Sequence, residues 1–334
     1  MPLPQSVVNP PLVESRETFW LFAVSESPFG RASAQCRSVY YRPMPGDPIF
    51  DVTTSLGECP VWDHRIEQLW WVDIDGTTVW RGDPASGKVV AFPSEGRPAA
   101  LALTANPAVV LVAREGELAW LDDGSFLPWI TLEDLPGNRL NDGRVAPDGS
   151  FWVGSMHADT SLRMSTGVLY RVLPSGWSTV ARTHIGVTNG LAFSPRGDRL
   201  FFADTFTDEV EAYDYPTSSV VDGEVFARLD SLNGRPDGGC VDSEGNYWLA
   251  AVHGSQLLCF SPQGDLKRTI EVPVVRPTRV TFGGPKLEQM FVTSIGPRPG
   301  DREDGQGLDG RVLVLDVGVA GLPEELFGGQ GTPE

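Results

Sequence analysis

The sequence predicts an all-β fold, a six-bladed β-propeller with four-stranded blades, on the basis of three observations. One motif recurs at intervals of about 41 to 48 residues, which is the spacing of propeller blades. Each repeat holds about four short apolar runs separated by Gly, Pro, Asp or Asn, as strands are separated by turns. No long stretch has the period of an amphipathic helix. An apolar residue just before the first turn marks each repeat: Trp62, Leu103, Val145, Phe193, Val241 and Phe282.

The repeat unit is plainest between Gly186 and Asp204. An Asn-Gly pair begins a short strand at 191–193, and a Pro-Arg-Gly-Asp turn at 195–198 leads to a second apolar run at 200–203. This stretch predicts two antiparallel strands joined by a hairpin turn.

The repeats follow one another from residue 53 to residue 323, which we predict to be a single propeller domain. Two inserts, at 157–165 and 296–309, are polar and are expected to be surface loops. The apolar run 311–316 is expected to close the last blade. Residues 1–52 do not repeat the pattern and are treated as an N-terminal extension of uncertain order, and 324–334 as a C-terminal tail. The blades begin near residues 53, 97, 138, 186, 235 and 276.

The composition excludes several classes of protein. The 334 residues are 41% hydrophobic and include ten Trp, which is ample material for a packed core. The net charge is −18 and no basic cluster offsets it, so we expect no nucleic-acid partner. We also expect neither a signal peptide nor a membrane span.

The four cysteines show no paired Cys-x-x-Cys spacing. This pattern suggests neither a disulfide nor a thiolate metal site, and it fits a reducing cytoplasm best. The cysteines are Cys36, Cys59, Cys240 and Cys259.

Four polar residues lie at comparable positions, just ahead of the predicted inner strands of four blades. Inner strands of a propeller line the central axis, so these side chains are expected to converge at one end of the channel. Carboxylate and carboxamide oxygens suit Ca²⁺, Mg²⁺ or Mn²⁺, and Zn²⁺ stays open. Asn-Gly and Pro-Asp-Gly are also common turn sequences, but Glu is a poor turn residue. The four residues are Glu58, Asn141, Asn189 and Asp237.

Five motifs, in this order, resemble the family of senescence marker protein (regucalcin), gluconolactonase and luciferin-regenerating enzyme. The resemblance covers nearly all of residues 53 to 323, and it implies a six-bladed propeller that holds one divalent cation on its axis and hydrolyses sugar lactones. The motifs are Gly-Glu-Cys-Pro-Val-Trp at 57–62, Asn-Asp-Gly-Arg-Val at 141–145, Thr-Asn-Gly-Leu-Ala-Phe at 188–193, Arg-Pro-Asp-Gly-Gly-Cys-Val-Asp at 235–242 and Thr-Phe-Gly-Gly at 281–284.

The resemblance also implies roles for single residues. Asn141 would lie near the cation and contact the substrate or a bound water, and Arg139 would bind the substrate. Cys59 stands where the family often has Gly, which is expected to alter packing beside the preceding residue without removing a ligand. The implied metal ligands are Glu58, Asn189 and Asp237.

The expected activity is therefore that of a metal-dependent hydrolase, a lactonase that opens an aldono-1,4- or 1,5-lactone to the aldonic acid. The cation, Ca²⁺ first with Zn²⁺, Mg²⁺, Mn²⁺ or Fe²⁺ compatible, would polarise the lactone carbonyl. Asp237 is expected to accept a proton from the attacking water and pass it to the ring oxygen. Arg139 and Asn141 would hold the sugar hydroxyls. His157 and His253 each follow a second strand, where a substrate contact or proton shuttle competes with an ordinary rim position.

Other functions remain to be distinguished from lactone hydrolysis. An organophosphate or ester hydrolase of the diisopropyl fluorophosphatase type would use a similar propeller and cation. A non-catalytic propeller for protein interaction or calcium binding belongs to another class. Against the protein-interaction alternative, no Gly-His or Trp-Asp signature recurs, and the polar residues gather at the strand starts.

Overall fold

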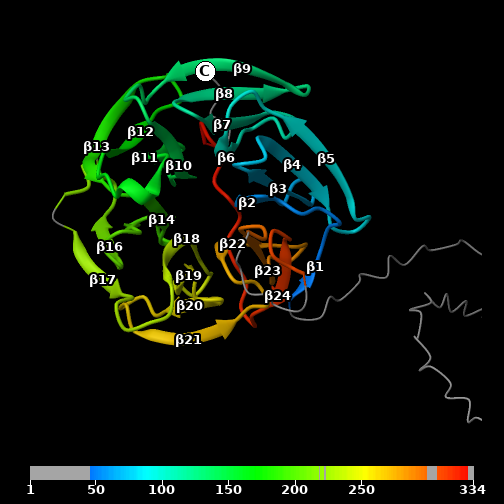
Figure 1. The fold of residues 1–334 in the computed structure, drawn as a ribbon, viewed down its shortest axis with the longest axis vertical. Helices are drawn as coiled ribbons and strands as arrows, with labels where there is room; N and C mark the ends of the chain where they lie inside the picture. The colour runs from blue at the N-terminus through cyan, green and yellow to red at the C-terminus, as the bar shows by residue number, and fades with distance from the viewer. Residues whose placement is uncertain (1–45, 218, 222, 299–306, 330–334) are drawn as a thin grey trace, which may run out of the picture. The chain divides into compact units, whose positions relative to one another are not determined.

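The computed structural model describes residues 46–217, 219–221, 223–298 and 307–329, and these form six four-stranded antiparallel sheets arranged as a ring (Figure 1). The predicted six-bladed β-propeller is confirmed. The first strand of each sheet lies nearest the axis and contacts the first strands of the two neighbouring sheets. These inner strands are β2 (Gly57–Asp63), β6 (Pro98–Leu103), β10 (Asn138–Val145), β14 (Thr188–Phe193), β18 (Arg235–Val241) and β22 (Pro277–Gly283).

The middle strands continue each blade outward and are almost as buried as the inner ones. Their apolar side chains pack between adjacent blades, as for the stacked rings of Trp62 and Phe291, whose centroids are 5.6 Å apart. The second strands are β3 (Gln68–Asp73), β7 (Val110–Arg114), β11 (Phe151–His157), β15 (Arg199–Asp204), β19 (Tyr247–Val252) and β23 (Gln289–Ser294). The third strands are β4 (Thr78–Asp83), β8 (Glu117–Asp122), β12 (Gly167–Val172), β16 (Glu209–Asp214), β20 (Gln256–Phe260) and β24 (Leu313–Asp316).

The outermost strands face solvent and are mostly exposed, whether their sequences are polar, as in β21, or apolar, as in β5. Five of them follow the third strand of their own blade directly. They are β5 (Lys88–Pro93), β9 (Ser125–Thr131), β13 (Ser178–Ile185), β17 (Glu224–Arg228) and β21 (Leu266–Glu271).

The sixth blade takes its outermost strand from the beginning of the described chain. The two-residue strand β1 (Asp47–Pro48) pairs with β24, and Phe50 stacks on the buried ring of Trp71 at 5.0 Å. The propeller therefore starts upstream of residue 53, the boundary that the repeats predict. The predicted closing strand at 311–316 contains β24. Residues 1–45 of the predicted extension lie outside the described residues.

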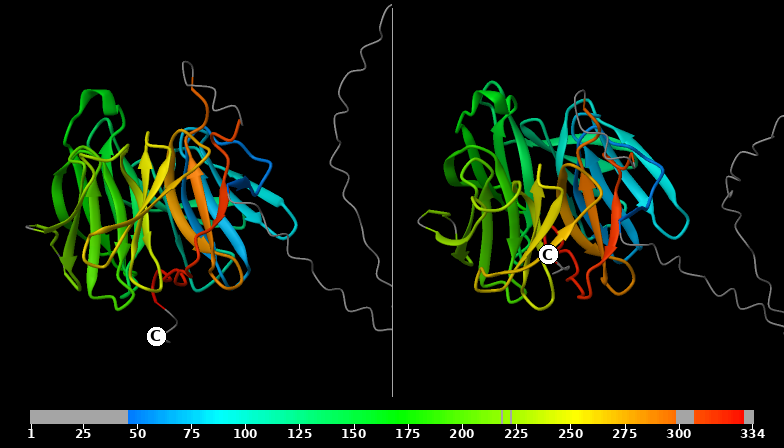
Figure 2. Two further views of the ribbon diagram at one scale, coloured as in Figure 1. Left: turned by 90° about the horizontal axis from the view of Figure 1, so that it is seen from below. Right: turned by 60° about the horizontal axis from the view of Figure 1, so that its bottom comes forward.

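The C-terminal segment crosses the end of the ring opposite the blade-three insert (Figure 2). Phe327 donates its backbone N–H to Leu103 at 2.8 Å, and Leu326 and Phe327 are buried against blade two. Residues 324–329 of the predicted tail are thus packed on the propeller, because this apolar pair finds a place in the core.

Helix is almost absent from the described part of the chain. A single 3₁₀ turn, Thr160–Leu162, lies in the insert between β11 and β12. None of the described helical structure has the length and apolar character of a membrane span.

Candidate functional site

A β-bulge lies near the start of each inner strand that carries a candidate ligand. Strand pairing shifts register after Glu58, between Leu140 and Gly143, after Asn189, and between Pro236 and Gly239. A bulge bends the strand and re-aims a side chain. The inner strands β6 and β22 shift register at the same place, so the bulge is common to all six blades and the candidate ligands lie at it in four of them.

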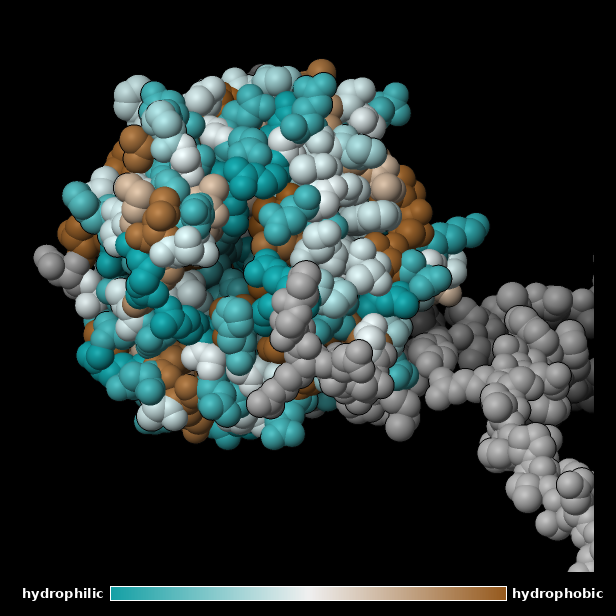
Figure 3. All heavy atoms as spheres, viewed as in Figure 1, coloured by the Kyte–Doolittle hydropathy of each residue, from teal (hydrophilic) through white to brown (hydrophobic). Residues whose placement is uncertain are grey.

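All four candidate oxygen donors line one cavity of about 330 Å³ at the start of the inner strands. Figure 3 shows the face of the ring seen in Figure 1, which is hollowed near the axis and has hydrophilic residues around the hollow. Arg139 and His253 line the same cavity, whereas His157 is not among its lining residues. The ring Nδ1 of His157 contacts the backbone of Asp159 instead.

The carboxyl groups of Glu58 and Asp237 are hydrogen-bonded to each other. Burial raises the pKa of Glu58 to about 7, although Arg279 and the backbone N–H of Cys59 favour its charge. Burial and then the charge of Glu58 raise the pKa of Asp237 well above its ordinary value. In the absence of a cation, burial therefore disfavours a negative charge on both groups at once.

Two hydrogen bonds determine which way the Asn189 carboxamide points. Its Nδ2 donates to Thr205 Oγ1 at 2.8 Å, and that hydroxyl in turn donates to the carbonyl of Pro236 at 2.8 Å. Because the Thr205 hydroxyl donates its hydrogen to the carbonyl of Pro236, it can act only as an acceptor toward Asn189. The Oδ1 of Asn189 is thus on the side of Asn141, whose Nδ2 donates to it at 3.5 Å, and both residues line the cavity.

Arg139 is a buried cation beside these oxygens. Its Nη1 donates to Asn141 Oδ1 at 2.7 Å and to the carbonyl of Leu140 at 2.9 Å, but it has no ion-pair partner in the described part of the chain. Burial, followed by the charge of Arg97, lowers the pKa of Arg139 to about 10. Asn141 is fixed in turn, because its Nδ2 donates to the carbonyl of Thr188 at 2.9 Å.

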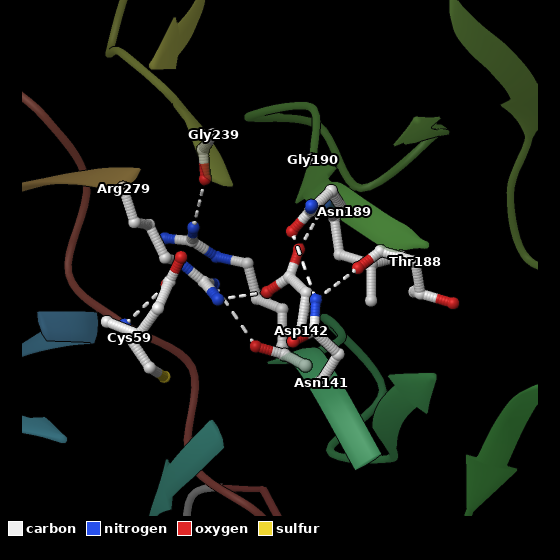
Figure 4. Close-up of polar contacts among 12 residues, drawn as sticks. Cys59, Asn141, Asp142, Thr188, Asn189, Gly190, Gly239 and Arg279 are labelled. Carbon is white, nitrogen blue, oxygen red and sulfur yellow. Dashed lines mark hydrogen bonds and ion pairs between the residues drawn. The ribbon is translucent and has the colours of Figure 1, made fainter. Parts of the chain in front are cut away.

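An ion pair between Arg279 and Asp142 lies buried among the inner strands (Figure 4). Arg279 lies on β22 and Asp142 on β10, which are opposite strands of the inner ring, so the pair spans the axis. Their side chains are 3% and 2% exposed. The second oxygen of Asp142 accepts the N–H of Leu191 at 2.9 Å, and Arg279 also donates to the carbonyl of Gly143.

A second cavity, also about 330 Å³, lies at the other end of the channel. Arg144 and Glu324, which form an ion pair of 2.6 Å, lie on its wall. The C-terminal segment therefore contributes to this end of the molecule and not to the candidate site.

Two further features lie beside the site. Asp73 and Asp204 end the second strands of their blades, and each accepts backbone N–H groups from the start of its own blade. Cys59 has a φ of 45°, a conformation that suits Gly, and its Sγ accepts the N–H of Leu101 at 3.2 Å. The thiol thus fills space beside Glu58, and Glu58 still lines the cavity.

The residues present fit a hard divalent cation. Glu58 and Asp237 supply two carboxylates, and Asn189 supplies a carboxamide oxygen, a donor set that Ca²⁺, Mg²⁺ and Mn²⁺ prefer. Two buried carboxyl groups in contact cannot both ionise without a positive charge between them. A cation between them would satisfy both.

Sequence reasoning missed several residues of the site. Asp142 belongs to the Asn-Asp-Gly motif and Arg279 to the start of blade six, but no sequence pattern shows that they pair. Arg163 and Arg235 line the cavity mouth and were not singled out. Arg235 lies at the start of blade five and Arg163 in the insert 157–165, and neither position by itself indicates a site.

Comparisons with known proteins give a consistent result. Residues 56–296 match the family model described as SMP-30/Gluconolactonase/LRE-like region. The chain is 34% identical to a 6-deoxy-6-sulfogluconolactonase of Pseudomonas putida (82% of this chain, 95% of the relative) and 31% identical to an L-arabinolactonase of Azospirillum brasilense (84% and 94%). Among solved structures, a calcium-binding protein, regucalcin, from Agrobacterium tumefaciens superposes with a TM-score of 0.79 at 28% identity, covering 84% of this chain and 97% of that one.

Proposed function

This chain belongs to the SMP-30/gluconolactonase/LRE-like family, and we propose that it is a hydrolase that opens a sugar lactone to the aldonic acid with the help of one divalent cation. The meeting of Glu58, Asn189 and Asp237 around one axial cavity carries this proposal. The relatives named as lactonases support the reaction, and the solved relative described as calcium-binding supports the cation.

In the proposed mechanism Glu58, Asn189 and Asp237 hold the cation. When bound, the cation would act as a Lewis acid on the lactone carbonyl. The Asp237 carboxylate accepts a proton from the attacking water and delivers it to the ring oxygen as the C–O bond breaks. Arg139 and Asn141 hydrogen-bond the sugar hydroxyls and hold the ring in place, and His253 on the cavity wall is a further candidate for substrate contact. His157 lies away from the lining and is the weakest candidate.

The test is a substrate panel under matched conditions. Purified protein supplied singly with Ca²⁺, Zn²⁺, Mn²⁺ or Mg²⁺ is assayed on gluconolactone, xylonolactone, arabinonolactone and diisopropyl fluorophosphate by acid release. We expect lactone opening to exceed fluorophosphate hydrolysis. The reverse order would favour an organophosphatase, and turnover of none of them would favour a non-catalytic propeller.

The cytoplasmic location expected from the cysteine pattern stays a prediction.

Replacing Arg139 by Ala is expected to raise KM for the lactone about tenfold or more, because a charge-assisted hydrogen bond to the substrate is lost. Cation affinity, measured by isothermal titration calorimetry, is expected to change less than KM, since Arg139 is not a proposed ligand. An unchanged KM would remove Arg139 from substrate binding.

A further inference from the structure

The cavity mouth is electrostatically lopsided. On the side of blades three to five it is lined by Arg163, Phe206 and Arg235. On the side of blades one and six it is lined mainly by apolar side chains, including Leu56, Ile74 and Ile295. A neutral sugar ring needs hydroxyl partners but no such concentration of positive charge.

Arg163 is held in a way that leaves its N–H groups available. Its guanidinium carbon lies 4.4 Å from the centroid of the Phe206 ring, and it forms no ion pair in the described part of the chain. A guanidinium that lies over an aromatic face keeps its edge free for a bidentate hydrogen bond to an anion.

The positive charge of Arg235 is only weakly balanced by a neighbouring carboxylate. Its nearest carboxylate oxygen belongs to Asp208 at 3.8 Å, and the Arg235 side chain is 42% exposed. The two carboxylates of the lining, Glu58 and Asp237, are assigned above to the cation. The mouth therefore keeps a positive charge, although the whole chain carries −18. In a protein with so negative a net charge, a local excess of positively charged side chains attracts and orients an anionic ligand.

We propose that Arg163 and Arg235 select a lactone that carries an anionic substituent, a phosphate, sulfonate or carboxylate, on the part of the sugar that points toward blades three to five. This inference rests on the proposed function, which places the lactone carbonyl at the axis. The arginines act in substrate binding and take no part in the bond-breaking step.

The experiment compares glucono-1,5-lactone with 6-phosphoglucono-1,5-lactone, which share a ring and differ in one substituent. We expect kcat/KM of the cation-loaded protein to be about tenfold or more higher for the phosphorylated lactone at low salt, and the preference to shrink as salt rises. Arg163→Gln and Arg235→Gln are each expected to reduce that preference about fivefold or more. The 6-sulfonate and the 6-carboxylate lactones, assayed in parallel, show which anion is preferred.

Arg196→Gln is the matched control, because Arg196 is 84% exposed beside the cavity at the other end of the channel, and it should leave the preference unaltered. Equal or better turnover of the neutral lactone, or a preference untouched by both site variants, would overturn the inference while leaving lactone hydrolysis intact.

Calorimetric binding of 6-phosphogluconate against gluconate separates the two proposals. If no lactone is hydrolysed but only the phosphorylated acid binds, and binding depends on Arg163 and Arg235, the anion site stands and the lactonase does not. If neither acid is preferred, the anion site is refuted.

Discussion

Glu58→Gln and Asp237→Asn are each expected to lower kcat/KM for lactone opening by about 10³-fold or more, and to abolish saturable cation binding. Each change keeps the size of the side chain and removes one of the two negative charges proposed to hold the cation. Chelation of the wild-type protein should have the same effect, and adding the cation back should restore activity to the wild type alone. The measurements are initial rates and calorimetric cation titration.

The same variants should not unfold the protein. Without a cation, burial raises the pKa of both Glu58 and Asp237, so an amide at either position removes a carboxyl group whose charge is unfavourable there. We expect the free energy of unfolding of the metal-free variants, from urea titration in chelator, to equal or exceed that of the wild type. Glu95→Gln is a suitable control, since Glu95 is exposed at the start of blade two and does not line the cavity. Full activity after exhaustive chelation would refute the mechanism.

Arg279→Met is expected to lower the free energy of unfolding by about 3–5 kcal/mol, because it leaves Asp142 buried without a counter-charge. Burial raises the pKa of Asp142 and is opposed by Arg279. Burial disfavours the charge of Arg279, but Asp142 together with Cys59, Glu58 and Glu324 outweighs this, so the pKa of Arg279 is raised above its ordinary value. The pair is thus held together in its charged form.

Urea denaturation checks this second prediction. The double variant Arg279→Met/Asp142→Leu should recover much of the lost stability, since no unpaired charge is left. Arg196→Met removes an exposed ion pair with Asp198 and should change stability by about 1 kcal/mol or less. Similar losses from Arg279→Met and Arg196→Met would mean that the axial pair does not stabilise the fold.

The fold was predictable because a propeller repeats itself, so each strand, turn and apolar run is seen six times. The convergence of Glu58, Asn141, Asn189 and Asp237 followed from the same repeat, since equivalent positions in successive blades face one axis. By contrast, β1 is a two-residue strand that pairs with β24, more than 260 residues away. Its sequence, Asp-Pro, has no strand character, and it forms a strand because closure of the ring brings it beside β24.

Other features depended on contacts that leave no mark on the sequence. The bulges after Glu58 and Asn189 are signalled only indirectly, by Gly190 and by a Cys59 that adopts a Gly-like φ. The pairing of Arg279 with Asp142 joins residues 137 positions apart across the ring. Likewise, the position of Arg163 depends on its contact with the ring of Phe206, which belongs to another blade.

Because a buried ion pair spans the axis, the candidate site is expected to open to solvent on one face of the ring only. The side chains of Arg279 and Asp142 are almost inaccessible to solvent, so we expect that a small molecule does not pass between the two faces of the ring. Whatever leaves the site must retrace the route by which its precursor arrived. An aldonic acid that lingers there would exclude the next lactone and compete with it directly.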